Sequence, residues 1–201
     1  MNGSTENYYL ARGYRRICGV DEAGRGPLAG PVVAAAVVFS EPVHIANLRD
    51  SKKLSPAKRE ELFEKILRVA QVGIGEASPA EIDAMNILQA SLLAMKRAVD
   101  SLTILPDIVL VDGPYALSGE IPSCAIIKGD ARVRVISAAS IIAKVTRDHR
   151  MLDYDKEFPG YGFARHKGYP TREHFEALKR LGPTHIHRMT FRGVLPASPC
   201  D

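Results

Sequence analysis

The stretch ICGVDEAGRGP, residues 17–27, joins a short apolar run to two adjacent acids and a glycine-rich turn. The apolar run predicts a buried strand over residues 17–21, because a short apolar segment bounded by turn residues is typical of a core strand. Asp21 and Glu22 then lie at the end of this strand. Neighbouring residues on a regular strand face opposite sides, so both acids serve one site only if the strand ends or bends here. The glycines that follow permit such a bend.

Outward from this stretch, apolar runs and helix caps alternate along the chain. We expect further strands over residues 32–39, 71–77, 107–113 and 124–127. We expect helices over residues 55–70, 78–102, 136–156 and 171–181. Ser55 and Ser78 precede prolines and are the expected caps, and Asn86 is a second cap inside its helix. This order predicts an α/β or α+β domain around one sheet.

Composition limits the class of protein. The chain has 201 residues, of which 46% are hydrophobic and 25% charged, as is usual for one folded domain. The longest apolar run, residues 30–39, is about half of what a membrane-spanning helix needs. The polar start of the chain does not resemble a secretory signal. Three cysteines without a C-x-x-C pair favour a reduced, cytoplasmic setting. We therefore expect a cytoplasmic protein without membrane association.

The chain is expected to form one domain. Residues 1–13 are polar and are predicted to be loose, and residues 14–201 are predicted to fold as a single unit. Within that unit, about residues 171–201 form a helical C-terminal extension. No linker or internal repeat divides the sequence.

Basic residues are concentrated in the C-terminal third. Between residues 128 and 192 there are 14 Lys and Arg against 7 Asp and Glu, although the whole chain has a formal net charge of +4. Such a region favours a polyanion partner, because each neutralised phosphate releases condensed counterions. A solvated basic surface without a partner is an equally good interpretation of the charge alone.

Four acids follow apolar strands: Asp21, Glu22, Asp112 and Asp130. An isolated acid at such a position is usually a turn residue. Four of them predict a site if the sheet brings the strand ends together, because neighbouring carboxylates protonate or recruit a cation. Oxygen ligands without His or Cys suit Mg²⁺ or Mn²⁺ rather than zinc. Two such ions about 4 Å apart clamp a phosphodiester, so acids and basic surface together indicate a metal-dependent nuclease or phosphoryl-transfer enzyme.

Two segments are candidate phosphate contacts. In Gly24-Arg25-Gly26, the glycines let the backbone approach a ligand closely, and the guanidinium matches phosphate geometry. A generic tight turn is the simpler interpretation of that spacing. Lys52 and Lys53 lie in a loop before a helix, where an ordinary charged loop is the alternative. His185-Ile186-His187 lacks a third ligand at zinc spacing.

A polar stripe runs along the helix expected over residues 136–156. Ser137, Ser140, Lys144 and Asp148 recur at positions that share one helix face. Lys144 and Asp148 form either an ion pair one turn apart or, through the lysine, a phosphate contact. Both interpretations stay open at this point.

Six segments of the chain recur in the order and spacing of one known family. They are DEAGRGP at 21–27, DSKKL at 50–54, VDG at 111–113, KGD at 128–130, SAASIIAKVTRD at 137–148 and HKGYPT at 166–171. With these motifs the chain resembles ribonuclease HII, the type 2 ribonuclease H, over nearly its whole length. The resemblance implies an α/β, ribonuclease H-like fold: a central mixed sheet flanked by helices, with a helical C-terminal region.

The resemblance also implies an activity. Members of this family hydrolyse the RNA strand of RNA·DNA hybrids and cleave on the 5′ side of single ribonucleotides embedded in duplex DNA. The products carry 3′-hydroxyl and 5′-phosphate ends, and two divalent cations, Mg²⁺ or Mn²⁺, take part. The implied partners are hybrids and ribonucleotide-containing duplexes, and we expect a monomer.

Residue roles follow from the matching positions. The four metal-site acids of the family match Asp21, Glu22, Asp112 and Asp130. Gly24, Arg25 and Gly26 match the loop that contacts the 2′-hydroxyl, and Tyr169 matches a tyrosine that packs on the sugar after the ribonucleotide. Elementary chemistry agrees. A 2′-hydroxyl both donates and accepts hydrogen bonds, and a backbone at contact distance can accept through its C=O groups and donate through its N–H groups. A core tyrosine is the alternative for Tyr169.

Two other activities are weighed against this one. A different metal nuclease of similar fold, such as an exonuclease or junction resolvase, shares the acids. A nucleic-acid binder without catalysis shares only the basic surface. The related type 3 enzymes carry an additional N-terminal substrate-binding domain, and because some sixteen residues precede the first strand, we expect type 2.

Overall fold

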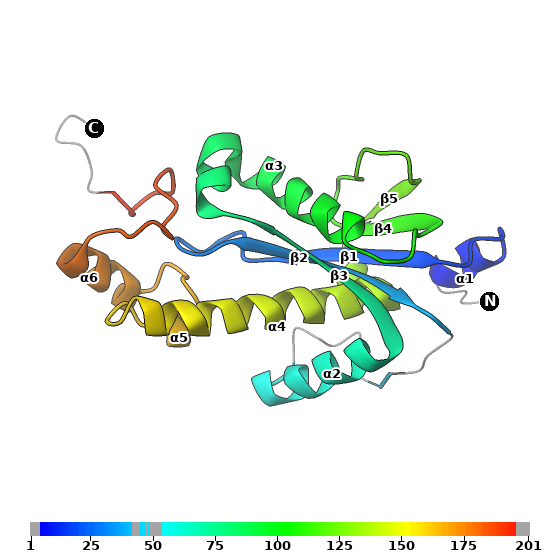
Figure 1. Ribbon diagram of the computed structural model, residues 1–201, viewed down its shortest axis with the longest axis horizontal. Coiled ribbons are helices and arrows are strands. Elements are labelled where there is room, and N and C mark those ends of the chain that lie inside the picture. Colours follow the sequence, from blue (N-terminus) through cyan, green and yellow to red (C-terminus); the bar gives the residue numbers. More distant parts are fainter. Residues whose placement is uncertain (1–4, 42–44, 47, 49–53, 196–201) are drawn as a thin grey trace.

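The computed structural model describes residues 5–41, 45–46, 48 and 54–195, and it places a sheet between helices on both sides (Figure 1). The strands are β1 (Ile17–Ala23), β2 (Val32–Phe39), β3 (Ala70–Ala77), β4 (Ile108–Asp112) and β5 (Ser123–Ile126). The helices are α1 (Thr5–Leu10), α2 (Pro56–Val69), α3 (Pro79–Asp100), the 3₁₀ turn η2 (Gly129–Ala131), α4 (Arg134–Glu157), α5 (Phe163–His166) and α6 (Arg172–Leu181). Every predicted strand and helix is present within two residues, whereas α1, η2 and α5 are not predicted.

The described strands form one mixed sheet in the order β3-β2-β1-β4-β5. β1 is antiparallel to β2 and parallel to β4, and β4 is parallel to β5. The carboxyl ends of β1, β4 and β5 therefore lie at the same edge of the sheet. Asp21 near the end of β1, Asp112 at the end of β4 and the segment leading to Asp130 after β5 all lie at this edge.

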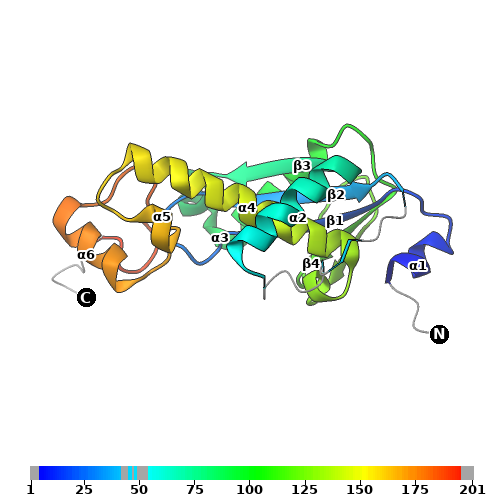
Figure 2. The same cartoon turned by 90° about the horizontal axis from the view of Figure 1, so that it is seen from below.

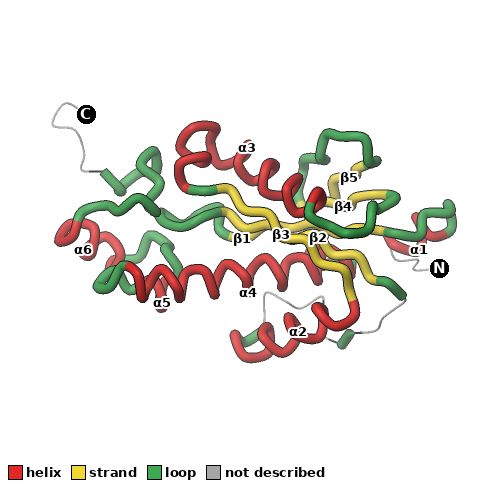
Figure 3. The backbone as a smooth tube through the Cα atoms, viewed as in Figure 1, coloured by secondary structure: helices red, strands yellow, loops and turns green. Residues whose placement is uncertain are grey.

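Helices cover both faces of the sheet, which is why β2 is apolar throughout. Ala34 and Ala36 pack in a cluster with α3, whereas Ala35 and Val37 pack with α2 and α4. α3 lies on one face and α4 with α2 on the other (Figures 1 and 3). At Gly19 a Cβ atom would lie 2.2 Å from the backbone of Val135, so α4 rests directly on β1. This contact fixes α4 beneath the strand that carries Asp21.

α4 extends beyond the sheet and carries the C-terminal part of the chain. Seen from below, α2 lies across α4, and α5 and α6 gather around its far end (Figure 2). A third cluster of buried side chains, built around Phe163 and Met151, forms the interior of this region. In the described residues no helix combines the length and apolar character needed to cross a membrane.

The N-terminal segment differs from the prediction. Residues 5–10 form α1 instead of a loose chain, because Glu6 has a structural partner. The Glu6 carboxylate is 3% exposed, accepts a hydrogen bond from the Val135 backbone N–H at 3.3 Å and pairs with Arg134. Val133, which precedes α4, makes no side-chain capping bond. Glu6 therefore supplies the missing cap from a distant part of the sequence.

The C-terminal extension also differs from the prediction. Up to residue 195, where the described part ends, it is helical only over α6, because Gly182 takes a φ of 75° and the following Pro183 cannot continue a helix. Residues 182–195 then return toward α3 without regular secondary structure. The Asp83 carboxylate on α3 accepts the backbone N–H groups of Met189 and Thr190.

The caps inside the fold agree with the sequence. Ser55 accepts a hydrogen bond from the Lys58 N–H, and Ser78 with Glu81 forms a complete capping box. Asn86 has a φ of 73° and interrupts α3, where its side chain accepts the N–H groups of Leu88 and Gln89. The predicted second cap is thus confirmed.

Candidate active site

The carboxyl ends of β1 and β4 separate at the site. β1 pairs with β4 only as far as Val20 opposite Val111, whereas its pairing with β2 continues to Ala23. Asp21 therefore lies on a part of β1 that β4 no longer borders, and Asp112 follows Val111, the last residue of β4 that pairs with β1. The sequence predicts that β1 ends at the two acids. It continues instead, and the departure of β4 opens the space between them.

Asp21 is a buried carboxylate among other carboxylates. Its side chain is bonded to Ser140 and accepts the Glu22 backbone N–H at 2.8 Å. Burial, followed by repulsion from Glu22 and Asp112, raises the pKa of Asp21 well above its usual value. Negative charges held this close favour a bound cation.

Glu22, the next residue of β1, also lines the cavity and forms an ion pair with Arg25. The Arg25 guanidinium lies 3.3 Å from the Glu22 carboxylate. Burial raises the pKa of Glu22, and Arg25 opposes that shift. Arg25 and a cation would therefore compete for the same carboxylate.

Asp112 fixes the turn that carries Asp130. Its Oδ1 accepts the backbone N–H of Gly129 at 2.7 Å and that of Asp130 at 3.3 Å. From the other side, the Ser137 hydroxyl on α4 donates to the Asp130 carbonyl at 2.5 Å. The turn η2 is thus tied to both β4 and α4, and it holds Asp130 next to Asp112.

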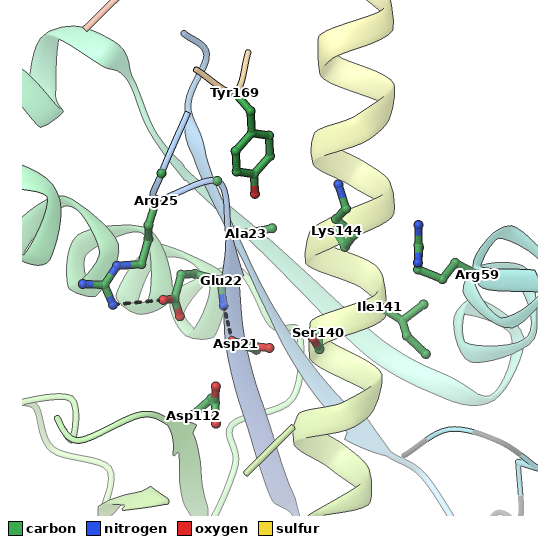
Figure 4. A pocket seen from close by; sticks show the side chains of 12 residues that line it. Asp21, Glu22, Ala23, Arg25, Arg59, Asp112, Ser140, Ile141, Lys144 and Tyr169 are labelled. Atoms are coloured by element: carbon green, nitrogen blue, oxygen red, sulfur yellow. Dashed lines mark hydrogen bonds and ion pairs between the residues drawn. The ribbon is translucent and has the colours of Figure 1, made fainter. Parts of the chain in front are cut away.

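A cavity of about 480 Å³ lies over the acids. It is lined by Asp21, Glu22, Ala23, Gly24, Arg25, Gly26, Arg59, Asp112, Ser140, Ile141, Lys144 and Tyr169. In Figure 4 the carboxylates gather at one end, Arg25 lies on one side, and Lys144 and Arg59 lie on the other. The cavity thus combines a negative floor with a positive rim, which suits a phosphate chain held against a cation.

Gly24 is required by its surroundings. Its φ is +97°, and a Cβ atom would lie 2.0 Å from Nε of Arg147. Arg147 is itself buried and donates to the carbonyls of Pro31, Ala29 and Lys167. It therefore joins the loop after β1 to the turn that precedes Tyr169.

Tyr169 faces the cavity rather than the core. Its side chain is 42% exposed, and a Cβ atom on Gly26 would lie 3.6 Å from its ring. Its backbone is held by His174, whose Nδ1 lies 3.0 Å from the Tyr169 carbonyl, and by the His166 carbonyl, which accepts its N–H. The alternative of a core tyrosine does not apply.

Two positively charged side chains, those of Lys144 and Arg59, lie on the far rim of the cavity. Lys144 forms the predicted ion pair with Asp148 at 2.6 Å and also lines the cavity, and its contact with a phosphate stays a prediction. Arg59 on α2 is not predicted from the sequence. It donates to the Leu54 carbonyl at 2.6 Å and reaches the cavity because α2 packs on α4. Only that tertiary contact identifies it.

Not every predicted residue gathers here. Lys52 and Lys53 lie outside the described residues. The side chain of Asp130 is buried but does not line the cavity. In the described part of the chain, no group of three or more His, Cys, Asp or Glu side chains forms a complete metal site. The donor chemistry nevertheless fits a hard cation, because the site offers carboxylate oxygens. These carboxylates are buried and repel one another, and a bound cation would neutralise that repulsion.

His187 belongs to the scaffold and not to a metal site. Its Nδ1 accepts the Thr184 N–H at 2.9 Å, and its Nε2 lies 3.2 Å from Nε2 of His174. Burial lowers the pKa of both imidazoles to about 4. The ring of His185 packs against Phe158.

Fold and site together define a metal-dependent nuclease of ribonuclease H-like architecture. A sequence model of the family described as Ribonuclease HII matches residues 18–194. Ribonuclease HII of Geotalea uraniireducens is 55% identical over 190 residues, which cover 94% of this chain and 88% of that protein. Ribonuclease HII of Nitrosococcus oceani is 52% identical over 181 residues, 90% of each chain. The chain belongs to the ribonuclease HII family, whose members are metal-dependent endonucleases that cleave RNA in RNA·DNA hybrids.

Solved structures agree with the family. The ribonuclease H2 of Pyrococcus horikoshii superposes with a TM-score of 0.74 at 33% identity, over 90% of this chain and 95% of that one. The RNase HII in a PCNA complex from Archaeoglobus fulgidus gives 0.75 at 28% identity, over 92% and 98%. A Bst-RNase HIII in complex with Mn²⁺ gives 0.67 at 19% identity, over 89% and 68%, and shows a shared fold. The predicted ribonuclease H-like fold is confirmed.

Proposed function

We propose that this chain, besides cleaving RNA in hybrids, cuts duplex DNA on the 5′ side of a single embedded ribonucleotide, leaving 3′-hydroxyl and 5′-phosphate ends. One observation carries the proposal: Asp21 and Asp112 share a cavity with the Gly24–Gly26 loop and Tyr169. Groups suited to a reactive phosphate and groups suited to a ribose thus lie within the reach of one nucleotide step.

The acids hold the divalent cations in this proposal. Asp21, Glu22, Asp112 and Asp130 are the ligands, and Mg²⁺ or Mn²⁺ fits their oxygen donors. Two bound cations would supply an activated water for attack and stabilise the leaving oxygen. The protein's own part is orientation: Ser140 and the Glu22 N–H fix Asp21, while Gly129 and Asp130 fix Asp112.

Arg25 links substrate binding to the readiness of the site. Without substrate it pairs with Glu22 at 3.3 Å. A phosphate offers the guanidinium a better bidentate partner than a single carboxylate oxygen. When Arg25 turns to the phosphate, Glu22 is released toward the cations. Substrate arrival and ligand release are therefore coupled at one side chain.

Ribose selectivity comes from the slot between the loop and Tyr169. Gly26 has no side chain between the loop and the tyrosine ring, where a Cβ atom would lie 3.6 Å from the ring. Backbone groups of the loop can donate to and accept from a 2′-hydroxyl. The ring of Tyr169 packs on the next sugar, where an added hydroxyl would crowd it, so an RNA-to-DNA junction is favoured.

Phosphates flanking the reactive one are held by the rim. Lys144 and Arg59 line the cavity. From the sequence alone, Lys52 and Lys53 are proposed as further phosphate contacts. The active form is proposed to be a monomer. Binding should weaken steeply with salt, because such contacts release counterions.

The decisive experiment is cleavage of a DNA duplex that contains one internal ribonucleotide, with and without Mg²⁺ and with the product ends identified. The proposal expects a single cut 5′ of the ribonucleotide, only with the cation, giving 3′-hydroxyl and 5′-phosphate ends. Cleavage of long hybrids without any cut at the single ribonucleotide would contradict it. Degradation from labelled ends would indicate an exonuclease instead.

A further inference from the structure

Arg188 lies outside the cavity but touches the loop that lines it. The segment after α6 returns beside the loop that follows β1 (Figure 1). Ala29 and His187 form an antiparallel bridge, the Gly30 N–H donates to the Ile186 carbonyl, and the Arg188 N–H donates to the Leu28 carbonyl, both at 2.8 Å. The backbone of Arg188 is thereby fixed against residues 28–30.

From that anchor the side chain reaches back to the substrate loop. Its guanidinium donates to the carbonyl of Gly24 at 2.6 Å, of Arg25 at 2.9 Å and twice to that of Gly30, at 3.0 and 2.8 Å. Arg188 is completely buried, and Phe191 covers it with its ring centroid 5.0 Å away. One rigid fork thus spans both ends of the loop, and a planar guanidinium fixes several carbonyls more firmly than a flexible ammonium does.

The anchor has a second support on α3. The Asp83 carboxylate accepts the N–H groups of the two residues after Arg188, at 2.8 and 3.0 Å, and the Thr190 hydroxyl at 2.6 Å. Asp83 itself does not line the cavity. It holds the segment from which Arg188 reaches inward, at a position remote from substrate.

We propose that Arg188 is a positioning residue that sets the backbone of Gly24 and Arg25 and thereby the preference of the site for a ribose. The proposal rests on the proposed role of the Gly24–Gly26 loop. Gly24 and Arg25 are consecutive residues, and one guanidinium binds both of their carbonyls. The peptide group between them is therefore held in a single orientation. A loop freed from that fork samples other orientations, and a displacement of about 1 Å costs a reaction as much as 100-fold.

The test compares Arg188→Lys, Arg188→Met and Asp83→Asn with the unchanged chain. We expect kcat on a single-ribonucleotide duplex to fall about 100-fold in Arg188→Met and about 10-fold in Arg188→Lys, because lysine keeps the charge but loses the fork. In Asp83→Asn we expect a loss of a few-fold. Duplex affinity should stay within about 3-fold, because phosphate contacts dominate binding.

A selectivity readout separates positioning from simple loss of stability. For each variant, kcat/KM is measured for a duplex with one ribonucleotide and for the same duplex with one 2′-fluoro-deoxynucleotide. The ratio of the two should fall in the Arg188 variants. Val99→Ala, which truncates a buried side chain of α3, is the matched control for stability and should keep the ratio. All assays are run well below each variant's melting temperature.

The outcomes are distinct. A folded Arg188→Lys protein with unchanged kcat and ratio overturns the inference, as does an equal loss in the Val99→Ala control. If Arg188→Met does not fold, the kcat and the selectivity ratio of Arg188→Lys and Asp83→Asn test the inference. If the unchanged chain itself shows a ratio near one, the proposed ribose-reading role of the loop fails instead, whatever Arg188 does.

Discussion

At one end of the cavity, Asp21 is buried beside Glu22 and Asp112, and its burial, followed by repulsion from these two acids, raises its pKa. Outside the cavity, behind the loop that lines its other end, Arg147 and Arg188 are buried as well, but their guanidinium groups are hydrogen-bonded to backbone carbonyls. In the described part of the chain, every buried side-chain nitrogen and oxygen has a hydrogen-bond partner. The acids are thus hydrogen-bonded but repel one another, whereas the arginines hold loops together through hydrogen bonds to backbone carbonyls.

The difference separates what the molecule does from what holds it in place. Like charges kept close together are unfavourable unless a cation or a positive ligand group joins them, so they mark the reactive end. Buried arginines whose guanidinium groups donate to backbone carbonyls mark the scaffold, since each fixes several loop carbonyls at once. Changes at the two ends should therefore have different signatures.

The largest effect is expected at the acidic end. Asp21→Asn and Asp112→Asn should each lower the cleavage rate by at least about 1,000-fold, because each removes a proposed cation ligand and its charge. Duplex binding should change less than about 3-fold, since the proposed phosphate contacts are made by the cationic side chains of the rim. Single-turnover cleavage and fluorescence anisotropy measure the two quantities. Near-normal turnover in both variants would remove the acids from the chemistry.

The scaffold end should respond to pH. His174 and His187 are buried and have pKa values of about 4, compared with 6.5 for a free imidazole. The unfolded chain takes up protons below pH 6.5 and the folded one does not, so stability is full above pH 6.5 and is lost as the pH falls toward 4. Each imidazole contributes up to about 3 kcal/mol to this loss.

Thermal melting between pH 7 and 4 measures this effect. The fall in melting temperature should flatten in His187→Gln. The control is His149→Ala, because His149 is half-exposed and pairs with Glu60 at the surface. An unchanged pH profile in His187→Gln would show that the buried imidazole pair is not its source.

Gly24 joins the two ends, so its substitution should harm both activity and stability. Gly24→Ala forces a Cβ atom toward Arg147 at a φ of +97°, and we expect about a 100-fold loss of cleavage and about 2 kcal/mol of stability. Gly13→Ala is the matched control, because Gly13 has a φ of +91° with no atom within 4 Å of its Cβ position. Gly13→Ala should lower the free energy of unfolding by about 1 kcal/mol and leave the cleavage rate unchanged. Equal effects at both glycines would contradict the close contact with Arg147.

The smallest effect is expected at Tyr169. Tyr169→Ala should reduce cleavage at a single ribonucleotide by about 10-fold more than cleavage of a long hybrid, because only the junction requires a deoxyribose under the ring. Tyr115→Ala, at another exposed tyrosine, is the control. Equal losses on both substrates would exclude junction sensing.

The sequence predicts the elements well because their signals are local. Strand residues that are apolar on both faces, the Ser78 capping box and the cap at Asn86 each depend on neighbouring residues alone. The acids are also visible, since they follow apolar runs. What makes them a site is the departure of β4 from β1 after Val20, and no periodicity encodes that.

The missed features depend on contacts between distant segments. Glu6 caps α4 across more than a hundred residues, and Arg59 reaches the cavity only because α2 packs on α4. Arg188 looks like any basic residue in the charged C-terminal third. Its burial and its bonds to Gly24 and Arg25 become visible only when the chain is folded.

The central claim is that the separated ends of β1 and β4 bind a divalent cation through Asp21 and Asp112. Mn²⁺ titration followed by electron paramagnetic resonance, on the unchanged chain and on Asp21→Asn and Asp112→Asn, tests it most directly. We predict that each variant binds Mn²⁺ at least about 10-fold more weakly than the unchanged chain. Equal binding by all three proteins would contradict the account.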